Sequence, residues 1–347
     1  MKSFPKLNPG ERGRFRRKLL HWFRIYKRDL PWRGTHDPYA VWVSEIMLQQ
    51  TRVAAVEERY VEIMRRFPNV QSLAAAALDE VLALWSGLGY YRRARMMHEA
   101  ARVIVDERMG ALPTSAEQWR TLPGIGRYTA AAIASIACGE PVCVVDGNVE
   151  RVLTRIHGSA LCGEQVPGKR MSGKQVSAEE VWAAADELLS RKHPGDFNQA
   201  MMELGATVCT PKSPGCLTCP VREFCATRGE HATVAPATRR KRDVAYALAR
   251  RGEKIGLVRR GAGESLMAGM WELPAGVANG RSAMMTVKHA ITTTDYTVRV
   301  FECRREDGRE DATCDDSKVR WFRTGELAQL PLTGLARKVL KRAGIIE

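Results

Sequence analysis

The sequence predicts a mainly α-helical N-terminal region followed by a smaller α+β domain. Through about the first 225 residues, apolar side chains recur with helical spacing between loops marked by Pro and Gly. After residue 243, short apolar runs alternate with turns and a last helix covers roughly residues 334–343, which is typical of a small sheet domain. A polar stretch that ends in Arg239-Arg240-Lys241-Arg242 has the composition of a linker between them.

Length and charge restrict the class of protein. A chain of 347 residues is long enough for two domains with sizeable cores. Its formal net charge of +15 indicates an anionic partner, although a merely soluble basic protein would show the same charge. Residues 1–30 contain no apolar signal segment and no stretch is long enough to span a bilayer, so we expect an intracellular protein without a membrane partner. Nine cysteines in such a compartment indicate metal or thiol chemistry rather than disulfides.

The segment 12–33 carries nine Lys or Arg residues and a single acid, Asp29. Apolar residues interleave with these charges as one face of a helix: Leu19, Leu20, Trp22, Phe23 and Ile25. A solvated basic face and a direct contact with DNA both fit this pattern.

The stretch from Leu122 to Val152 combines a turn with a carboxylate. Gly124 and Gly126 flank Ile125 and permit a tight turn before a helix rich in Ala and Ile. The amides of such a turn and the N-terminus of the next helix converge on one point, which suits a phosphate oxygen. An ordinary loop between core helices would also match, but Asp146 follows just before another helix and favours a functional site.

Glu45 lies inside an apolar helix that begins near Tyr39, with no basic residue within four positions on either side. Burial raises the pKa of a carboxyl group, and a protonated carboxylic acid can serve as a general acid. The alternative is a surface glutamate on an amphipathic helix.

Two tyrosines and three arginines follow a glycine turn in the segment WSGLGYYRRAR, residues 85–95. Tyr90 and Tyr91 could pack in a core beside a polar edge. They could equally form a wedge that stacks into an unpaired site in DNA while the arginines hold phosphates.

Four cysteines stand close together with gaps of six, two and five residues: Cys209, Cys216, Cys219 and Cys225. Four such thiolates can hold a cubane iron–sulfur cluster or one tetrahedral zinc ion, and structural zinc is the alternative to iron.

These features together resemble the MutY adenine DNA glycosylases of the helix-hairpin-helix superfamily that includes endonuclease III. The strings SEIMLQQT and GLGYY, the turn followed by Asp146, and the cysteine spacing carry the resemblance, which extends from about residue 13 to 343 and is most specific in the first 225 residues. It implies a helical DNA glycosylase domain over 1–228, a basic linker over 229–243 and a Nudix-like lesion-recognition domain over 244–347. Within the glycosylase domain it places the helix-hairpin-helix at 122–132 and a [4Fe–4S] cluster loop at 209–225.

The resemblance implies a monofunctional enzyme that hydrolyses the N-glycosidic bond of adenine mispaired with 8-oxoguanine or guanine in double-stranded DNA. Neutral Glu45 would protonate the adenine, and Asp146 would stabilise or trap the oxocarbenium-like sugar. Asn148 and Tyr128 would orient water and hold these groups. Because lyase-type relatives carry a Schiff-base lysine at the Tyr128 position, strand cleavage is not expected. We expect a monomer in the cytoplasm of a bacterium, associated with the nucleoid.

The resemblance also implies a set of substrate-binding residues. Arg33 and Leu48 would line the base pocket, and Gln199 would read the adenine edge. The others would contact the DNA or the opposite base: Gln50 and Tyr90 inside the duplex, Gly124 and Gly126 at a phosphate, and Thr292 and Thr293 at the damaged guanine. The family has Phe-Ser-His in that last loop where this chain has Ile291-Thr292-Thr293, so we expect weaker discrimination of 8-oxoguanine. The acidic metal-binding helix of active Nudix enzymes is missing, and pyrophosphate hydrolysis is not expected.

Two other functions fit the sequence. One is a mismatch glycosylase of the same fold with another target base, such as thymine. The other is a non-catalytic protein that binds DNA lesions, against which the presence of both Glu45 and Asp146 argues.

Overall fold

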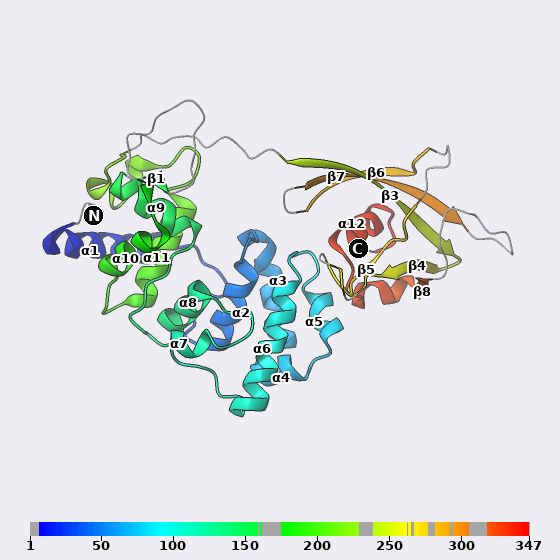
Figure 1. The fold of residues 1–347 in the computed structure, drawn as a ribbon, viewed down its shortest axis with the longest axis horizontal. Coiled ribbons are helices and arrows are strands. Elements are labelled where there is room, and N and C mark those ends of the chain that lie inside the picture. The colour runs from blue at the N-terminus through cyan, green and yellow to red at the C-terminus, as the bar shows by residue number, and fades with distance from the viewer. Residues whose placement is uncertain are drawn as a thin grey trace. The chain divides into compact units, whose positions relative to one another are not determined.

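The computed structural model describes residues 7–158, 160–161, 175–228, 239–261, 263–264, 267–276, 282–291, 294–304 and 318–346. The chain divides into two compact units, each built from segments distant in sequence (Figure 1). The first unit joins residues 1–49 to 102–236, and the second joins residues 50–101 to 237–347. Among the described residues, no helix is both long and apolar enough to cross a membrane.

The first unit is helical. Its helices are α1 (Pro9–Tyr26), α2 (Pro38–Leu48), α7 (Ala116–Trp119), α8 (Arg127–Ala137), α9 (Gly147–His157), α10 (Ala178–Leu188) and α11 (Pro194–Thr207), with a short parallel pair β1 (Ala160–Leu161) and β2 (Gln175–Val176). Polar residues accept from first-turn amides and so fix where several of these helices begin: Asn8, Asp37, Asp146 and Ser177. Pro at the first position of α1, α2 and α11 suits the fixed φ of that residue.

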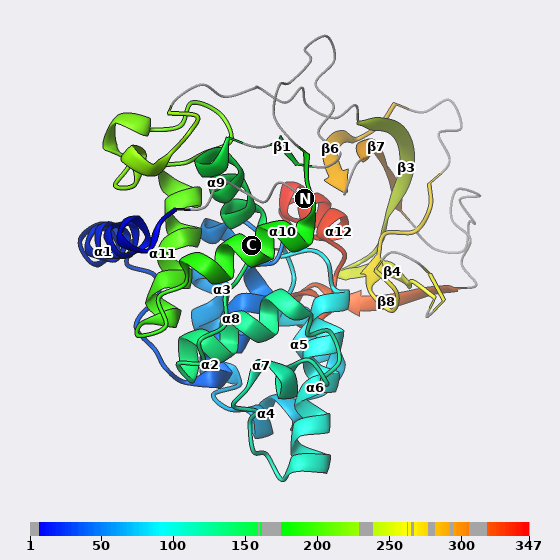
Figure 2. The ribbon, with the colours of Figure 1, turned by 60° about the vertical axis from the view of Figure 1, so that its left-hand side comes forward.

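Helix α2 is buried over nine of its eleven residues, and it packs against α8. Two glycines of α11 set how closely that helix approaches α8 and α9 (Figure 2). A Cβ on Gly195 would lie 2.6 Å from the carbonyl oxygen of Ser135 in α8, and one on Gly205 would lie 2.6 Å from the Cβ of Asn148 in α9. The absence of side chains at these two positions therefore brings α8, α9 and α11 together around the candidate site.

The second unit combines helices with a mixed six-stranded sheet. Its helices are α3 (Val53–Arg66), α4 (Val70–Ala75), α5 (Leu78–Leu84), the first part of α6 (Arg92–Arg108) and α12 (Gly334–Arg342). Its strands are β3 (Arg240–Arg251), β4 (Lys254–Arg259), β5 (Trp271–Glu272), β6 (Met285–Ile291), β7 (Thr294–Arg304) and β8 (Val319–Arg323). The strand order is β5-β4-β3-β7-β6, with β8 also paired to β4. The pair β3–β7 is parallel, and the other pairs among these described strands are antiparallel. Leu335, Ala336, Val339 and Leu340 of α12 complete the core of this sheet.

The predicted domain boundaries differ from this arrangement. Residues 50–101, which the sequence assigns to the glycosylase domain, group with the C-terminal sheet in one compact unit, and polar contacts join the two segments. Arg337 Nε donates to Ser86 Oγ over 2.7 Å, and the hydroxyl of Tyr91 donates to the Leu332 carbonyl over 3.3 Å. In addition, β3 begins at Arg240, so the end of the predicted linker 229–243 is already a strand, paired in parallel with β7.

Candidate active site

Glu45 is 7% exposed on α2, and one of its carboxylate oxygens accepts a hydrogen bond from the Tyr128 hydroxyl over 2.8 Å. The pKa of Glu45 is raised to about 7, chiefly by burial and also by the nearby charge of Asp146. The hydrogen bond from Tyr128 and the positive charge of Arg33 act in the opposite direction. At neutral pH this carboxyl group is therefore populated in both its neutral and its ionised form, as a general acid requires.

Tyr128 stands in the first turn of α8 and connects two sides of the site. Its hydroxyl also lies 3.2 Å from the sulfur of Met202 on α11. Burial, and then the charges of Glu45 and Asp146, raise the pKa of Tyr128 well above its ordinary value. The phenol therefore stays protonated and can act as a hydrogen-bond donor throughout the physiological pH range.

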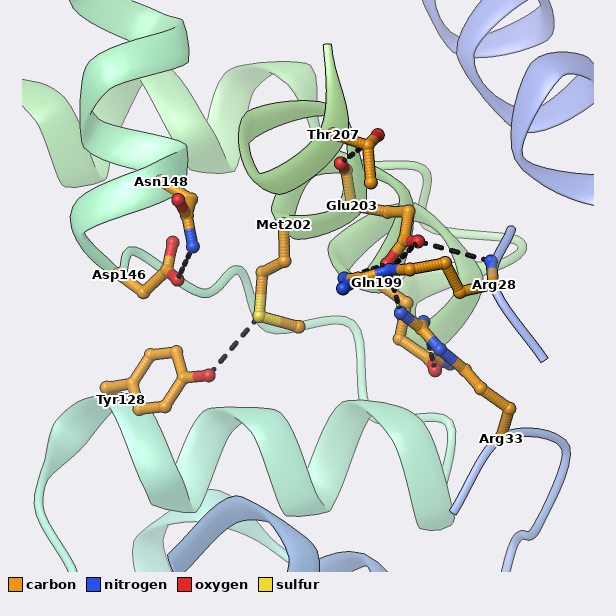
Figure 3. A network of polar contacts seen from close by, with 9 residues as sticks. All are labelled: Arg28, Arg33, Tyr128, Asp146, Asn148, Gln199, Met202, Glu203 and Thr207. Carbon is orange, nitrogen blue, oxygen red and sulfur yellow. Dashed lines mark hydrogen bonds and ion pairs between the residues drawn. The ribbon is translucent and has the colours of Figure 1, made fainter. Parts of the chain in front are cut away.

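Asp146 is the N-cap of α9, and both of its carboxylate oxygens accept hydrogen bonds. One accepts from the Val149 amide over 2.7 Å, and the other accepts from Asn148 Nδ2 over 2.9 Å (Figure 3). Arg151 holds the other end of that amide, donating to Asn148 Oδ1 over 2.7 Å and to the Cys209 carbonyl over 2.9 Å. Asp146 and Asn148 thus form one rigid group at the start of α9.

Arg33 and Gln199, which the resemblance assigns to the base pocket, are hydrogen-bonded to each other. Arg33 Nη1 donates to Gln199 Oε1 over 2.9 Å (Figure 3). The same guanidinium lies over the ring of Phe23 and donates to Glu203, whose side chain is 1% exposed. Arg28 binds this carboxylate as well, through Nε over 2.6 Å and Nη2 over 2.9 Å.

The predicted phosphate-binding turn has the backbone that its glycines require. Gly124 has a φ of 76°, in the left-handed region, and Ile125 between the two glycines is 7% exposed. Gly126 is the N-cap of α8 and offers no side chain to the amides of the first turn. The amides of this first turn thus face no capping side chain, as an anion-binding helix terminus requires.

Leu48 is half-buried near the end of α2 in the first unit, whereas Gln50 and Tyr90 belong to the second. Both Gln50, with a φ of 53°, and Tyr90, with a φ of 47°, adopt the left-handed conformation. Tyr90 is 44% exposed while its neighbour Tyr91 is 4% exposed, so one tyrosine packs in the core and the other faces outward. The guanidinium of Arg93 joins the two turns: it donates to Thr51 Oγ1 over 2.9 Å and to the carbonyls of the 88–89 turn, over 3.1 Å each.

The four cysteines of the loop line one small pocket together with Val208, Arg222 and Arg228. All four are free of disulfides. Burial, and then the charges of the other three thiols, raise the pKa of Cys219 to about 11. In the part of the chain that the structure describes, no group of three or more His, Cys, Asp or Glu side chains is arranged as a metal site. The donor set nevertheless fits an iron–sulfur cluster, since four thiols outside any disulfide line one pocket.

The residues expected to sense the damaged guanine, Thr292 and Thr293, lie outside the described residues, between the end of β6 at Ile291 and the start of β7 at Thr294.

Several residues that hold this site together were missed from the sequence. Met202 and Glu203 follow Gln199 at the helical spacings of three and four, so they lie on the same side of α11. That spacing was a usable signal. No sequence signal indicated that Arg151 would join Asn148 to Cys209, because this contact depends on how α9 and α11 cross.

Comparison with known proteins agrees with this geometry. Residues 43–165 match the family model described as HhH-GPD superfamily base excision DNA repair protein. Among solved structures, a thermostable thymine-DNA glycosylase is similar with a TM-score of 0.54 and 26% identity, covering 64% of this chain and 98% of that one. A non-covalent endonuclease III–DNA complex shares the fold with a TM-score of 0.50 and 21% identity, covering 64% of this chain and 97% of that one.

Several curated relatives share one description. The adenine DNA glycosylase of Homo sapiens is 50% identical over 223 residues, which are 62% of this chain and 39% of the human protein. That of Arabidopsis thaliana is 36% identical over 81% of this chain and 50% of its own length, and that of Buchnera aphidicola subsp. Schizaphis graminum is 38% identical over 61% and 58%. The chain thus spans about half the length of the relatives it matches. Residues 43–165 thus match the HhH-GPD base-excision repair superfamily, and the three relatives named above are described as adenine DNA glycosylases.

Proposed function

We propose that this protein is an adenine DNA glycosylase that hydrolyses the N-glycosidic bond of adenine in duplex DNA. The observation that carries the proposal is the grouping of buried Glu45, the Tyr128 hydroxyl that donates to it, and the Asp146 carboxylate whose charge reaches both. Two carboxyl groups at one site, one of them with a raised pKa, are the arrangement that glycosidic bond cleavage uses. The shared description of the curated relatives supports adenine as the base.

The residues suggest how the reaction proceeds. Adenine must leave the base stack and enter a pocket, where Arg33 and Gln199 would contact it. The neutral carboxyl of Glu45 would give its proton to a ring nitrogen, which makes the base a better leaving group. Bond cleavage then leaves positive charge on the sugar, which Asp146 at the start of α9 would stabilise or trap. Tyr128 would hold Glu45 in place, and because a phenol cannot form a Schiff base, the enzyme would release the base without cleaving the strand.

We include in the proposal that the adenine is mispaired with 8-oxoguanine or guanine. The Gln50 and Tyr90 turns, which Arg93 joins, are suited to enter the duplex, since Tyr90 is exposed in a conformation that costs energy to hold. The mixed sheet of the second unit would be the Nudix-like part that reads the opposite base. Thr292 and Thr293 would then give weaker discrimination against guanine than a His-bearing loop.

We also propose that Cys209, Cys216, Cys219 and Cys225 hold a [4Fe–4S] cluster that ties the loop together. Bound iron should give a brown protein with broad visible absorption and about four irons per chain. Metal analysis of purified protein checks this, and a colourless protein with one zinc ion would contradict it.

The decisive test of function is single-turnover release of adenine from duplexes containing A:8-oxoguanine, A:G or A:T, with a T:G duplex as the comparison. Release of adenine from the mispairs supports the proposal, whereas release of thymine alone would favour the thymine-specific alternative. Asp146→Asn should retain DNA binding and lower the rate of adenine release at least about 10²-fold, since the amide lacks the negative charge that the sugar cation needs. Binding without release in the wild type would instead indicate a lesion sensor.

The proposed setting is a monomer acting on DNA in the nucleoid of a bacterial cell. Relatives are found in both bacteria and eukaryotes, and a bacterial source is what we propose for this chain.

A further inference from the structure

Glu203 is the most completely paired carboxylate near the candidate site. Its Oε1 accepts from the Arg28 amide over 3.2 Å and from Arg28 Nε over 2.6 Å. Its Oε2 accepts from Arg28 Nη2 over 2.9 Å and from Arg33 Nη2 over 2.5 Å. The Glu203 side chain is 1% exposed and that of Arg33 is 11% exposed, so the bond between them is charge-assisted and largely shielded from water, whereas Arg28 is 38% exposed.

The position of Glu203 on α11 connects it to the proposed chemistry. Gln199, Met202 and Glu203 stand at spacings of three and four on one side of the helix. Met202 contacts the hydroxyl of Tyr128, and Gln199 accepts from Arg33 (Figure 3). The same Tyr128 hydroxyl donates to Glu45. One side of α11 therefore faces the Glu45 site, and Glu203 lies at the end of that row.

Arg33 mediates between Glu203 and Gln199. A guanidinium can only donate, so the atom of Gln199 that faces it is the amide oxygen, and the NH₂ end is directed elsewhere. Arg33 leaves a loop rather than a helix, and Glu203 is the anion that its second nitrogen binds. Without this anchor, a long arginine side chain would populate several rotamers and the orientation of Gln199 would no longer be defined.

We propose that Glu203 is a positioning residue of the adenine pocket: it fixes the Arg33 guanidinium, and through it the amide of Gln199, and it balances the Arg33 charge beside Glu45. The kinetic consequences of this inference rest on the proposed function. The orientation of Arg33 and Gln199 by Glu203 does not depend on that function.

The charge balance gives the proposal a specific signature. The groups that act on Glu45 are Tyr128 from α8, Asp146 at the start of α9 and Arg33 from the loop before α2. Arg33 favours the ionised form of Glu45, and Glu203 offsets that positive charge. Removing the Glu203 charge should therefore lower the pKa of Glu45, and the proton donor would be lost at a lower pH.

The test compares Glu203→Gln, which removes the charge at nearly constant volume, with Glu203→Asp, which keeps the charge but shortens its reach. In Glu203→Gln we expect single-turnover adenine release at pH 6 to fall about 10-fold or more, and the alkaline limb of the rate to move to lower pH by about half a unit or more. Glu203→Asp should be slowed without that movement of the limb. A merely structural role would slow both variants equally at every pH, and that result would overturn the proposal.

Glu187→Gln is the matched control. It breaks another ion pair between helices, Arg12 with Glu187 over 2.5 Å, which joins α1 to α10 and has no contact with the pocket residues. Its rate and pH profile should equal those of the wild type, and a similar loss there would count against a specific role for Glu203.

Crystal structures of the wild type and of Glu203→Gln separate the failure of this proposal from the failure of the proposed function. We expect the bond from Arg33 Nη1 to Gln199 Oε1 to be present in the wild type and lost in the variant. If it persists unchanged in the variant, the positioning role is wrong, whatever base the enzyme removes. If the wild type releases no adenine, the proposed function fails while these two structures still decide the positioning role. Should Glu203→Gln not fold, the same comparison is made with Glu203→Asp, whose shorter side chain should lengthen or break the bond.

Discussion

At the scale of single residues, the most unusual feature is the buried carboxyl group of Glu45, which water can hardly reach. Glu45 is 7% exposed among apolar neighbours on α2, and its carboxylate accepts a hydrogen bond from the hydroxyl of Tyr128. Holding an ionised carboxylate there is unfavourable, which is why burial raises its pKa to about 7. The same burial that makes the ionised group unfavourable raises its pKa, and the raised pKa allows Glu45 to act as an acid at neutral pH.

This cost predicts a pH-dependent effect of Glu45→Gln on stability. Between pH 4.5, the ordinary pKa of Glu45, and about 7, the folded protein binds a proton that the unfolded chain has lost, so the free energy of unfolding falls as pH rises. Because glutamine does not titrate, the Glu45→Gln variant does not lose stability in this way as the pH rises. Its stability relative to the wild type should rise by about 3 kcal/mol from pH 4 to pH 8, as an order of magnitude. Denaturant unfolding at both pH values measures the difference, and a constant offset would show that Glu45 is not perturbed.

At the scale of elements, α11 organises the first unit both through its glycines, which have no side chain, and through the side chains that it directs to the candidate site. Gly195 lets it approach α8, and Gly205 lets it approach the first turn of α9, where Asn148 holds Asp146. The carbonyl of Gly205 also accepts from Arg151 over 2.8 Å. The distance between α11 and α9 therefore sets the position of the proposed catalytic carboxylate.

Gly205→Ala should both destabilise the protein and slow base release. Its Cβ would stand 2.6 Å from the Asn148 Cβ and 2.9 Å from the Asn148 carbonyl oxygen, so the helices must separate. Overpacking of this kind costs about 1–3 kcal/mol, and a shift of Asp146 by a fraction of an ångström reduces catalysis. Thermal unfolding and single-turnover kinetics measure the two effects. For stability, Gly147→Ala is the control, because no atom lies within 4 Å of its added Cβ; equal stability of the two variants would contradict the packing argument.

At the scale of the whole molecule, the chain is organised by units that sequence order does not follow. The second unit joins helices α3 to α5 and the turn before α6 to the C-terminal sheet, through Ser86, Tyr91 and the ion pair between Asp79 and Arg259. The turn that carries exposed Tyr90 is thus anchored on both sides by residues bonded to Leu332. The C-terminal part supports this turn directly.

Arg337→Met should loosen the turn around Tyr90. It removes the donor to Ser86, a fully buried hydroxyl that itself donates to the Leu332 carbonyl over 3.4 Å. Loss of a bond to a charged donor costs about 1.5–3 kcal/mol, so amides near Tyr90 should exchange with deuterium faster. Mass spectrometry of peptides covering residues 85–91 measures this. Lys338→Met, which loses a contact to the Lys288 carbonyl instead, should leave these peptides unchanged, and equal exchange in both variants would argue against the anchoring.

The sequence by itself determined the local features whose physics is local. Helical periodicity placed α2, α8 and α11, and the glycines around Ile125 indicated a tight turn, in which Gly124 is left-handed. The absence of basic neighbours around Glu45 predicted a raised pKa. The four-cysteine spacing and the motif strings led to the superfamily that the comparisons confirm.

Tertiary structure alone decided which distant residues share a bond. Arg33 and Glu203 are 170 positions apart, and Ser86 and Arg337 are 251 apart, so no pattern within either segment could show that they meet. The arginines from 12 to 28 looked free to contact DNA, yet Arg12, Arg16 and Arg28 bind α10 or α11. Helix packing determines which ion pairs form. Here the close approach of α11 to α8 at Gly195 and to α9 at Gly205 determines which side chains meet in the proposed pocket.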